Sequence, residues 1–421
     1  MNKVLVSAVL AASVALPSTV LAQDEPIRIG ILVALEGAFA EGGADGVRNV
    51  EMALEQAGFS AGGRTIEYVV APSDTTPDTA VRQARKLVEQ DNVDIILGPL
   101  SGSEGIALRD YAKTVPEVTI INGISGALET TWVDPADNFF RFNLDGAQWG
   151  AGLGSYVVEE KGWNRVATVA ADYSFGYTNF LGFAVDFCRA GGEIVDRFWV
   201  PLGSSDFGGV IAALPDDVDA IYLGVGGTDA INFLNQYQQA GTETNLIGGT
   251  IMADQTVLTS RGRAKDALIG TPTSGPLATD NTDEAWTSYV ELYQNSFPED
   301  ERFPAPSLFG VGYYVAALAA LQALEAVGGD LSDGQAAFQE ALASTPLDTP
   351  LGTVELNENR QATGTVFINE VVEDGEGGLT NTLVATREGV NQTLGMSPDE
   401  FRAMGLPSRD TPDCSALGGA G

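Results

Sequence analysis

The sequence contains no histidine and only two cysteines among its 421 residues. Without histidine, the chain cannot form Ser-His-Asp or Cys-His nucleophile systems, nor a zinc site with histidine ligands. It also contains no G-x-x-x-x-G-K-[ST] phosphate loop and no G-x-S-x-G nucleophile turn. An enzyme mechanism would have to depend on carboxylates alone. We therefore expect no catalytic residue, no metal site and no cofactor.

Basic residues are scarce as well. Lysine and arginine number 22 against 57 aspartates and glutamates, which gives a net charge of −35. Nucleic-acid binding requires a basic face, and anionic membrane surfaces repel such a chain, so we expect neither partner. An anionic ligand is still compatible with this charge, because a local group of backbone N–H donors can outweigh a distant field.

The N-terminus has the features of an export signal. Lys3 precedes an apolar segment from Val4 to Leu16, and a small-residue ending at Ala22 is followed by polar residues. This pattern predicts a cleavable signal peptide over residues 1–22 and a location in the periplasm. No later run of about 18 apolar residues is apparent, so we expect no further membrane span.

The two cysteines are Cys188 and Cys414. In an oxidising compartment a single pair most often forms a disulfide, so we expect these two residues to be bonded. The bond would tie the C-terminal tail to the end of a helix in the middle of the chain.

The most informative segment covers residues 27–59. An apolar run from Ile27 to Leu35 predicts a buried strand, and a glycine-rich turn with Gly37, Gly42 and Gly43 is expected after it. Apolar residues then recur at helical spacing from Val47 to Ala57. A strand that enters a helix through a glycine loop directs backbone N–H groups toward a ligand in that loop.

Strand-like and helix-like segments alternate along the rest of the chain. The pattern is typical of an α/β fold whose parallel sheets carry helices on both faces, and the length favours two domains. After residue 275 the chain is expected to return to the first half, and several crossings between the halves would form a hinge. We expect lobe I to comprise residues 26–142 and 276–350, lobe II residues 143–275 and 351–395, and a C-terminal tail residues 396–421.

Candidate ligand contacts lie in loops that follow strands, where ligands bind in open α/β sheets. Serine, glycine and alanine residues in two of these loops could cap helices or hold a carboxylate, and both roles are compatible. Aromatic residues would supply apolar walls, and acidic residues could pair with a ligand ammonium group. The candidate anion contacts are Ser101, Gly102, Ser103, Ser125, Gly126 and Ala127; the aromatic candidates are Phe39, Trp149, Tyr173 and Phe175; the acidic candidates are Glu41, Asp229 and Asp254.

The motifs NVDIILGPLSGSEG, IINGISGALETT and ADYSFGYT, with others in the same order, cover nearly the whole mature chain. In this series the sequence resembles the type I periplasmic binding proteins of the leucine/isoleucine/valine-binding family, which deliver solutes to ABC importers. The resemblance implies two Rossmann-like lobes joined by a three-strand hinge, with the ligand held between them. It adds the loops at Gly226–Asp229 and Thr250–Gln255 to the expected site. Thr250 stands where the amino-acid binders place a glutamate against the ligand ammonium.

The sequence thus predicts an exported, monomeric solute-binding protein that works with ABC permease subunits. Its ligand would be a small amino acid, another carboxylate, including aromatic ones, or an amide. The alternative is a periplasmic sensor for amino acids, amides or urea.

Overall fold

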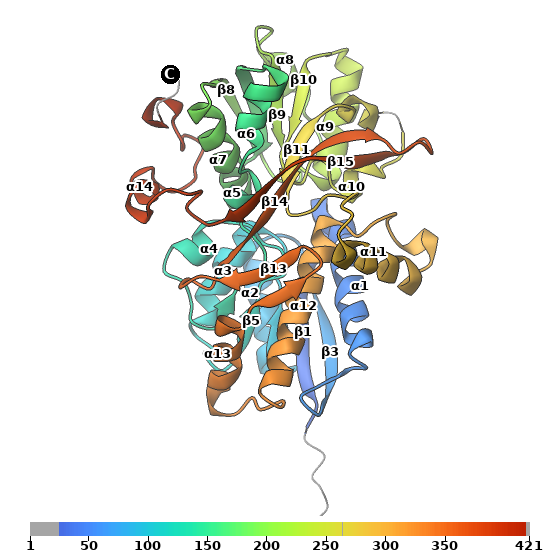
Figure 1. Cartoon of the computed structure of the whole chain (residues 1–421), viewed down its shortest axis with the longest axis vertical. Coiled ribbons are helices and arrows are strands. Elements are labelled where there is room, and N and C mark those ends of the chain that lie inside the picture. Colours follow the sequence, from blue (N-terminus) through green and yellow to red (C-terminus); the bar gives the residue numbers. More distant parts are fainter. Residues whose placement is uncertain (1–24, 263, 418–421) are drawn as a thin grey trace, which may run out of the picture.

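The computed structural model describes residues 25–262 and 264–417. The expected signal peptide at 1–22 lies outside the described residues. Within the described residues the chain forms two lobes, each with a twisted sheet covered by helices, as Figure 1 shows one above the other.

Lobe I contains a six-stranded sheet in the order β2-β3-β1-β4-β5-β6, which is parallel except for β2. Its central strands are buried on both faces, which explains why β1 reads as a nearly continuous apolar run. The elements are β1 (Ile27–Ala34), η1 (Gly37–Phe39), α1 (Ala40–Gln56), β2 (Ser60–Ala61), β3 (Arg64–Ser73), α2 (Pro77–Glu89), β4 (Ile95–Leu97), α3 (Gly102–Ala112), β5 (Thr119–Ile121), α4 (Glu129–Trp132), β6 (Phe139–Phe140), α11 (Glu284–Ser296), η4 (Glu299–Glu301), α12 (Leu308–Ala326), η5 (Asp333–Gln335), α13 (Ala336–Ser344), β12 (Leu347–Thr349) and β13 (Gly352–Leu356).

Lobe II is built on the parallel strands β8, β7, β9, β10 and β11, to which β14 and then β15 add in antiparallel orientation. β13 and β12, named above among the elements of lobe I, pair on beyond β14 and complete a nine-stranded sheet. The expected α/β fold with two lobes is confirmed, and the antiparallel additions make this sheet mixed. The elements are α5 (Gly146–Trp149), α6 (Leu153–Tyr156), η2 (Val157–Lys161), β7 (Arg165–Ala171), α7 (Ser174–Arg189), β8 (Glu193–Val200), α8 (Gly208–Ala213), β9 (Ala220–Gly224), α9 (Gly227–Ala240), β10 (Asn245–Gly248), α10 (Gln255–Leu258), η3 (Ala264–Leu268), β11 (Pro272–Gly275), β14 (Ala362–Glu373) and β15 (Leu379–Val390).

The extent of the glycine-rich turn expected after β1 needs correction. α1 begins at Ala40, so Gly42 and Gly43 lie inside the helix. A Cβ atom at Gly43 would lie 1.7 Å from the carbonyl oxygen of Ala34, and one at Gly42 would lie 2.4 Å from the ring of Phe309. These glycines therefore allow α1 to pack closely against the end of β1 and the start of α12. The sequence pattern suggested a loop because glycines are more common in turns than in helices.

The helix α12 is long and apolar enough to cross a membrane, although the sequence prediction found no such segment. In the structure 83% of its apolar window is buried. It packs against α1 in the core of lobe I, and the tyrosine hydroxyl of Tyr313 donates a hydrogen bond to the carbonyl of Leu32. α12 is thus a core helix of this lobe.

Three segments cross between the lobes, after β6, after β11 and from β13 to β14 (Figure 1). β12 and β13 pack against α12 and α13 of lobe I. The limits of the two lobes expected from the sequence stay a prediction. The first and third crossings touch where Arg141 pairs in parallel with Gln361.

The side chain of Arg141 is fully buried at this junction. It donates hydrogen bonds to the carbonyl of Ala127 at 2.7 Å and the hydroxyl of Thr131 at 2.6 Å, and it also bonds to Gln361. Asp145 forms an ion pair with it at 3.5 Å. Burial lowers the pKa of Arg141 to about 10, against the opposing effect of Asp145, so the guanidinium stays charged near neutral pH. The hinge is therefore held by a buried charged network.

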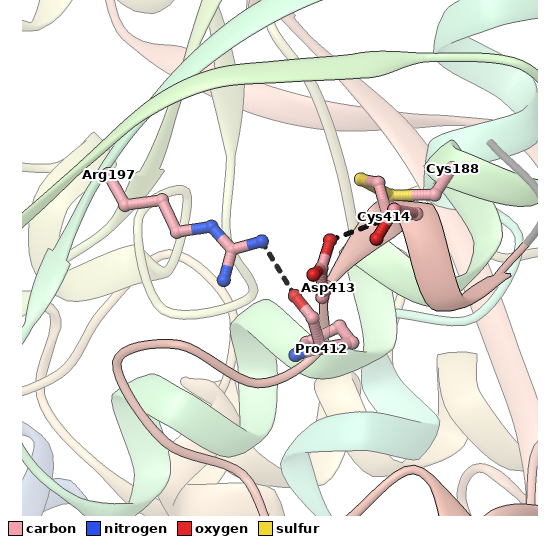
Figure 2. The surroundings of a disulfide bond; sticks show 6 residues. Cys188, Arg197, Pro412, Asp413 and Cys414 are labelled. Carbon is pink, nitrogen blue, oxygen red and sulfur yellow. Dashed lines mark hydrogen bonds between the residues drawn. A yellow bond between two sulfur atoms is a disulfide. The ribbon is translucent and has the colours of Figure 1, made fainter. Parts of the chain in front are cut away.

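The C-terminal tail contacts both lobes. Its helix α14 (Pro398–Ala403) places Phe401 edge-on against Trp132 of lobe I, with 5.2 Å between ring centroids. The short helix η6 (Cys414–Leu417) joins lobe II through the Cys188–Cys414 disulfide, with a Cα–Cα distance of 5.3 Å. Figure 2 shows Arg197 beside this bond, donating to the carbonyl of Pro412 at 2.6 Å. The tail is therefore fixed to lobe II near its end.

Candidate ligand-binding site

A cavity of about 270 Å³ lies where the two lobes meet. Phe39 and Ser101 come from lobe I, whereas Tyr173 and Ile251 come from lobe II, so both lobes contribute to the cavity wall. The lining residues are Phe39, Leu100, Ser101, Gly102, Ile124, Gly126, Trp149, Tyr173, Phe175, Ile251, Leu308 and Phe309.

Aromatic rings form most of the apolar wall. Trp149 and Phe175 meet edge-on with 5.8 Å between centroids, and Phe39 lies 5.6 Å from Phe309. The indole Nε1 of Trp149 is buried and has no hydrogen-bond partner among the described residues. Burial raises the pKa of Tyr173, so its hydroxyl stays neutral. The cavity wall thus consists mainly of flat apolar surfaces.

Two helix N-termini converge on the cavity from opposite lobes. Ser101 caps α3 and accepts a hydrogen bond from the N–H of Glu104, while α7 begins without any side-chain cap. The hydroxyls of Ser103 and Ser174 lie 3.1 Å apart across the interface. Each helix start carries partial positive charge and free N–H groups, so together they favour an anionic group of the ligand.

The carboxylates considered as partners for an ammonium group are engaged elsewhere. Asp229 accepts a hydrogen bond from the N–H of Gly203 at 2.7 Å. Asp254 caps α10 and accepts from the N–H of Leu308 at 2.7 Å, which joins lobe II to lobe I. Glu41 is exposed on α1. None of the three lines the cavity.

Of the fifteen residues proposed from the sequence, the structure brings seven together in the cavity wall. Ser125 instead donates to Asn122 at 2.6 Å, and Thr250 bonds to the amide of Asn179. Ala127 is buried beside Arg141, and Gly226 packs against Ile251. The seven are Phe39, Ser101, Gly102, Gly126, Trp149, Tyr173 and Phe175.

Five lining residues are not among the individually expected contacts, although Ile251 lies in the expected loop Thr250–Gln255. Leu100 and Ile124 lie inside the two loops already singled out, and their apolar character within polar loops was the available signal. Ile251 directly follows Thr250. Leu308 and Phe309 begin α12, and only the return of the chain from lobe II to lobe I brings them to the cavity.

Comparison with known proteins gives the family. The family model described as periplasmic binding protein matches residues 26–376, most of the chain. The chain belongs to the periplasmic binding protein family. The match ends before the C-terminal tail.

An ABC transporter substrate-binding protein from Sphaerobacter thermophilus is 28% identical, with a TM-score of 0.77 over 87% of this chain and 99% of that chain. A solute-binding protein of an ABC transporter from Rhodopseudomonas palustris BisB5, solved with 3,4-dihydroxybenzoic acid, is 24% identical, with a TM-score of 0.79 over 87% of this chain and 98% of its own. The "Leu/Ile/Val-binding protein homolog 6" of Brucella melitensis is 22% identical over 375 residues, 87% of this chain and 93% of its own. The resemblance drawn from the sequence motifs is confirmed.

In this periplasmic binding protein Glu104 lies behind the start of α3. Its carboxylate accepts the N–H of Ser101, which completes a reciprocal cap. Burial raises the pKa of Glu104 to about 6, although the hydrogen bonds with Ser101 act in the opposite direction. The folded chain therefore binds a proton that the unfolded chain releases between pH 4.5 and about 6, so the contribution of Glu104 to stability decreases as pH rises through this window.

We expect Glu104→Gln to increase the free energy of unfolding above pH 7 by about 2 kcal/mol, because the amide keeps the bond to Ser101 and carries no buried charge. Urea unfolding of the wild type and the variant at pH 4.5 and 7.5 measures the change. Glu55→Gln, at an exposed position on α1, serves as the matched control. A stability gain that is equal at both pH values would show that the buried charge is not the cause.

Proposed function

We propose that this protein captures a small carboxylate with a flat apolar body between its lobes and delivers it to an ABC permease. Export by the N-terminal signal would place the capture step in the periplasm. The protein acts as a binder without catalysis, and closure of the hinge removes water from the ligand.

The observation that carries this proposal is the combination of aromatic walls with two opposed helix N-termini. The rings of Trp149, Phe175 and Phe39 suit a planar apolar body, and the starts of α3 and α7 suit a carboxylate. The 24% identical protein solved with 3,4-dihydroxybenzoic acid supports an aromatic acid as the ligand class.

A branched-chain amino acid is the second candidate, favoured by the name of the Brucella melitensis relative. An α-ammonium group buried in the cavity would need a carboxylate partner. Asp229 and Asp254 already accept hydrogen bonds from the backbone N–H groups of Gly203 and Leu308, and neither carboxylate lines the cavity. This arrangement favours a ligand without an ammonium group.

Isothermal titration of the exported protein with benzoate, 3,4-dihydroxybenzoate, benzamide, leucine and isoleucine tests both candidates. We expect the two aromatic acids to bind, with a matching rise in melting temperature, and the amide and the amino acids to bind at least tenfold more weakly. If only leucine binds, the ligand is an amino acid and the proposed aromatic ligand class is wrong. If none of the compounds binds, the proposal is overturned.

A substitution at Gly126 locates the site. A Cβ atom at Gly126 would lie 2.9 Å from the ring of Phe175 and 3.1 Å from that of Trp149, so Gly126→Val fills the cavity. We expect this variant to lose ligand affinity by more than tenfold while it stays folded by circular dichroism. Gly209→Val in α8, where no atom lies within 4 Å of the added Cβ, is the matched control. Unchanged affinity of Gly126→Val would place the ligand elsewhere.

Delivery to a permease has a separate test. Deletion of the gene should abolish uptake of the ligand identified by titration, and a copy that encodes Gly209→Val should restore it. A copy that encodes Gly126→Val should not. Normal uptake without the protein, together with a changed transcriptional response to the ligand, would support the sensor function instead.

A further inference from the structure

A second apolar pocket, here called the hinge pocket, lies under the three crossings between the lobes. Its empty volume is about 500 Å³, including space that is open to solvent. Phe142 follows β6, Pro276 follows β11 and Thr365 lies near the start of β14, so each stands at the end of a different crossing. Val311 and Val315 come from α12 and Val354 from β13. Because all three crossings contribute to its wall, the hinge pocket is part of the region that bends when the lobes open.

The hinge pocket and the ligand cavity share two wall residues, Ile124 and Leu308. Both side chains are nearly fully buried. The Cδ1 atom of Ile124 occupies the space left by the missing side chain of Gly312, since a Cβ there would lie 2.4 Å from it. Two aliphatic side chains therefore stand between the cavity and the hinge pocket.

The backbone of Ile124 and Leu308 is held by hydrogen bonds, whereas their side chains, which separate the cavity from the hinge pocket, are not. The N–H of Leu308 is held by Asp254, and the N–H of Ile124 donates to the carbonyl of Pro99 at 3.1 Å. Ile124 and Leu308 can change rotamer without breaking these bonds, because aliphatic side chains carry no polar partner. A rotamer change would join the two pockets while the helix starts that favour the carboxylate stay in place.

We propose that the hinge pocket receives the distal apolar part of an elongated ligand, so that the protein selects arylalkyl carboxylates over benzoate itself. This inference rests on the proposed carboxylate site. With the carboxylate at the starts of α3 and α7, a longer body passes between Ile124 and Leu308 and contacts all three crossings. Ile124 and Leu308 are then specificity-determining residues of the site.

A homologous series of ligands tests the proposal by titration of the whole protein. Benzoate, phenylacetate, 3-phenylpropanoate and 4-phenylbutyrate differ by one methylene each. We expect the affinity to rise about fourfold per methylene, the gain from burying one such group. If benzoate binds and the affinity stays constant or falls along the series, the hinge-pocket proposal is wrong and the proposed function stands. If no compound of the series binds, both the hinge-pocket proposal and the proposed aromatic carboxylate site are wrong.

Two variants separate the hinge pocket from the ligand cavity. Thr365→Phe, on β14 and outside the cavity wall, fills the hinge pocket and should remove the gain for 4-phenylbutyrate while benzoate affinity changes less than twofold. Ile124→Ala widens the passage and should increase the ratio of 4-phenylbutyrate to benzoate affinity. Circular dichroism and the melting temperature check that both variants fold. An equal loss for all ligands in Thr365→Phe, or an unchanged ratio in Ile124→Ala, would contradict the proposal.

Discussion

Removal of the Cys188–Cys414 disulfide should destabilise the protein by about 5 kcal/mol in the chain-entropy model. The reason is the 226-residue separation between the two cysteines, since the bond restricts a very long loop in the unfolded chain. Thermal unfolding of Cys188→Ser/Cys414→Ser beside the oxidised wild type measures the loss. Thiol titration of the exported protein should find no free thiol.

The double variant also distinguishes the bond from the contacts of the tail. Without the disulfide, the tail keeps the ion pair of Arg409 with Asp172, the hydrogen bond from Arg197 to the carbonyl of Pro412 and the contact of Phe401 with Trp132. Truncation after residue 395 removes those contacts together with the bond. If truncation lowers the melting temperature no further than the serine variant, the covalent bond accounts for the role of the tail, and an unchanged melting temperature in both would contradict the prediction.

Arg141→Met should lower the free energy of unfolding by about 3–5 kcal/mol, because it leaves the buried carboxylate of Asp145 without its cation. Burial already raises the pKa of Asp145, and the guanidinium of Arg141 acts in the opposite direction. The same variant frees the carbonyl of Ala127, which follows the loop that lines the ligand cavity, so ligand affinity should fall as well. Urea unfolding and titration measure the two effects.

The matched control is Arg360→Met. Arg360 lies one residue from Gln361 and pairs with Asp137, whose side chain is 94% exposed, so its loss should cost less than about 1 kcal/mol. Arg141→Met/Asp145→Asn should recover part of the stability, since asparagine keeps the N-terminal cap of α5 and carries no charge. Absence of recovery would show that packing around Arg141 matters more than the charge of Asp145.

Local pattern identified the elements whose signals lie within a few residues. The apolar run expected as a strand forms β1, one of the parallel strands of lobe I, and Ser101, expected as a possible helix cap, caps α3. The loops that follow these strands could also be placed, because the carboxyl ends of parallel strands meet at one edge of a sheet.

Contacts between distant residues could not be predicted in the same way. The glycines of α1 read as a turn until Ala34 and Phe309 are seen against them. Asp254 was expected to face a ligand ammonium, yet the tertiary structure brings the N–H of Leu308, 54 residues later, to its carboxylate.

By itself, the sequence determined the α/β class, the family resemblance, the export expectation and the cysteine pair, because each depends on composition or on the order of local motifs. Only the tertiary structure decided which side chains share the cavity, that Arg141 holds the hinge and that Ile124 and Leu308 separate two pockets. The physical reason is that burial and hydrogen-bond satisfaction are properties of the folded arrangement, in which partners 50 to more than 200 residues apart meet.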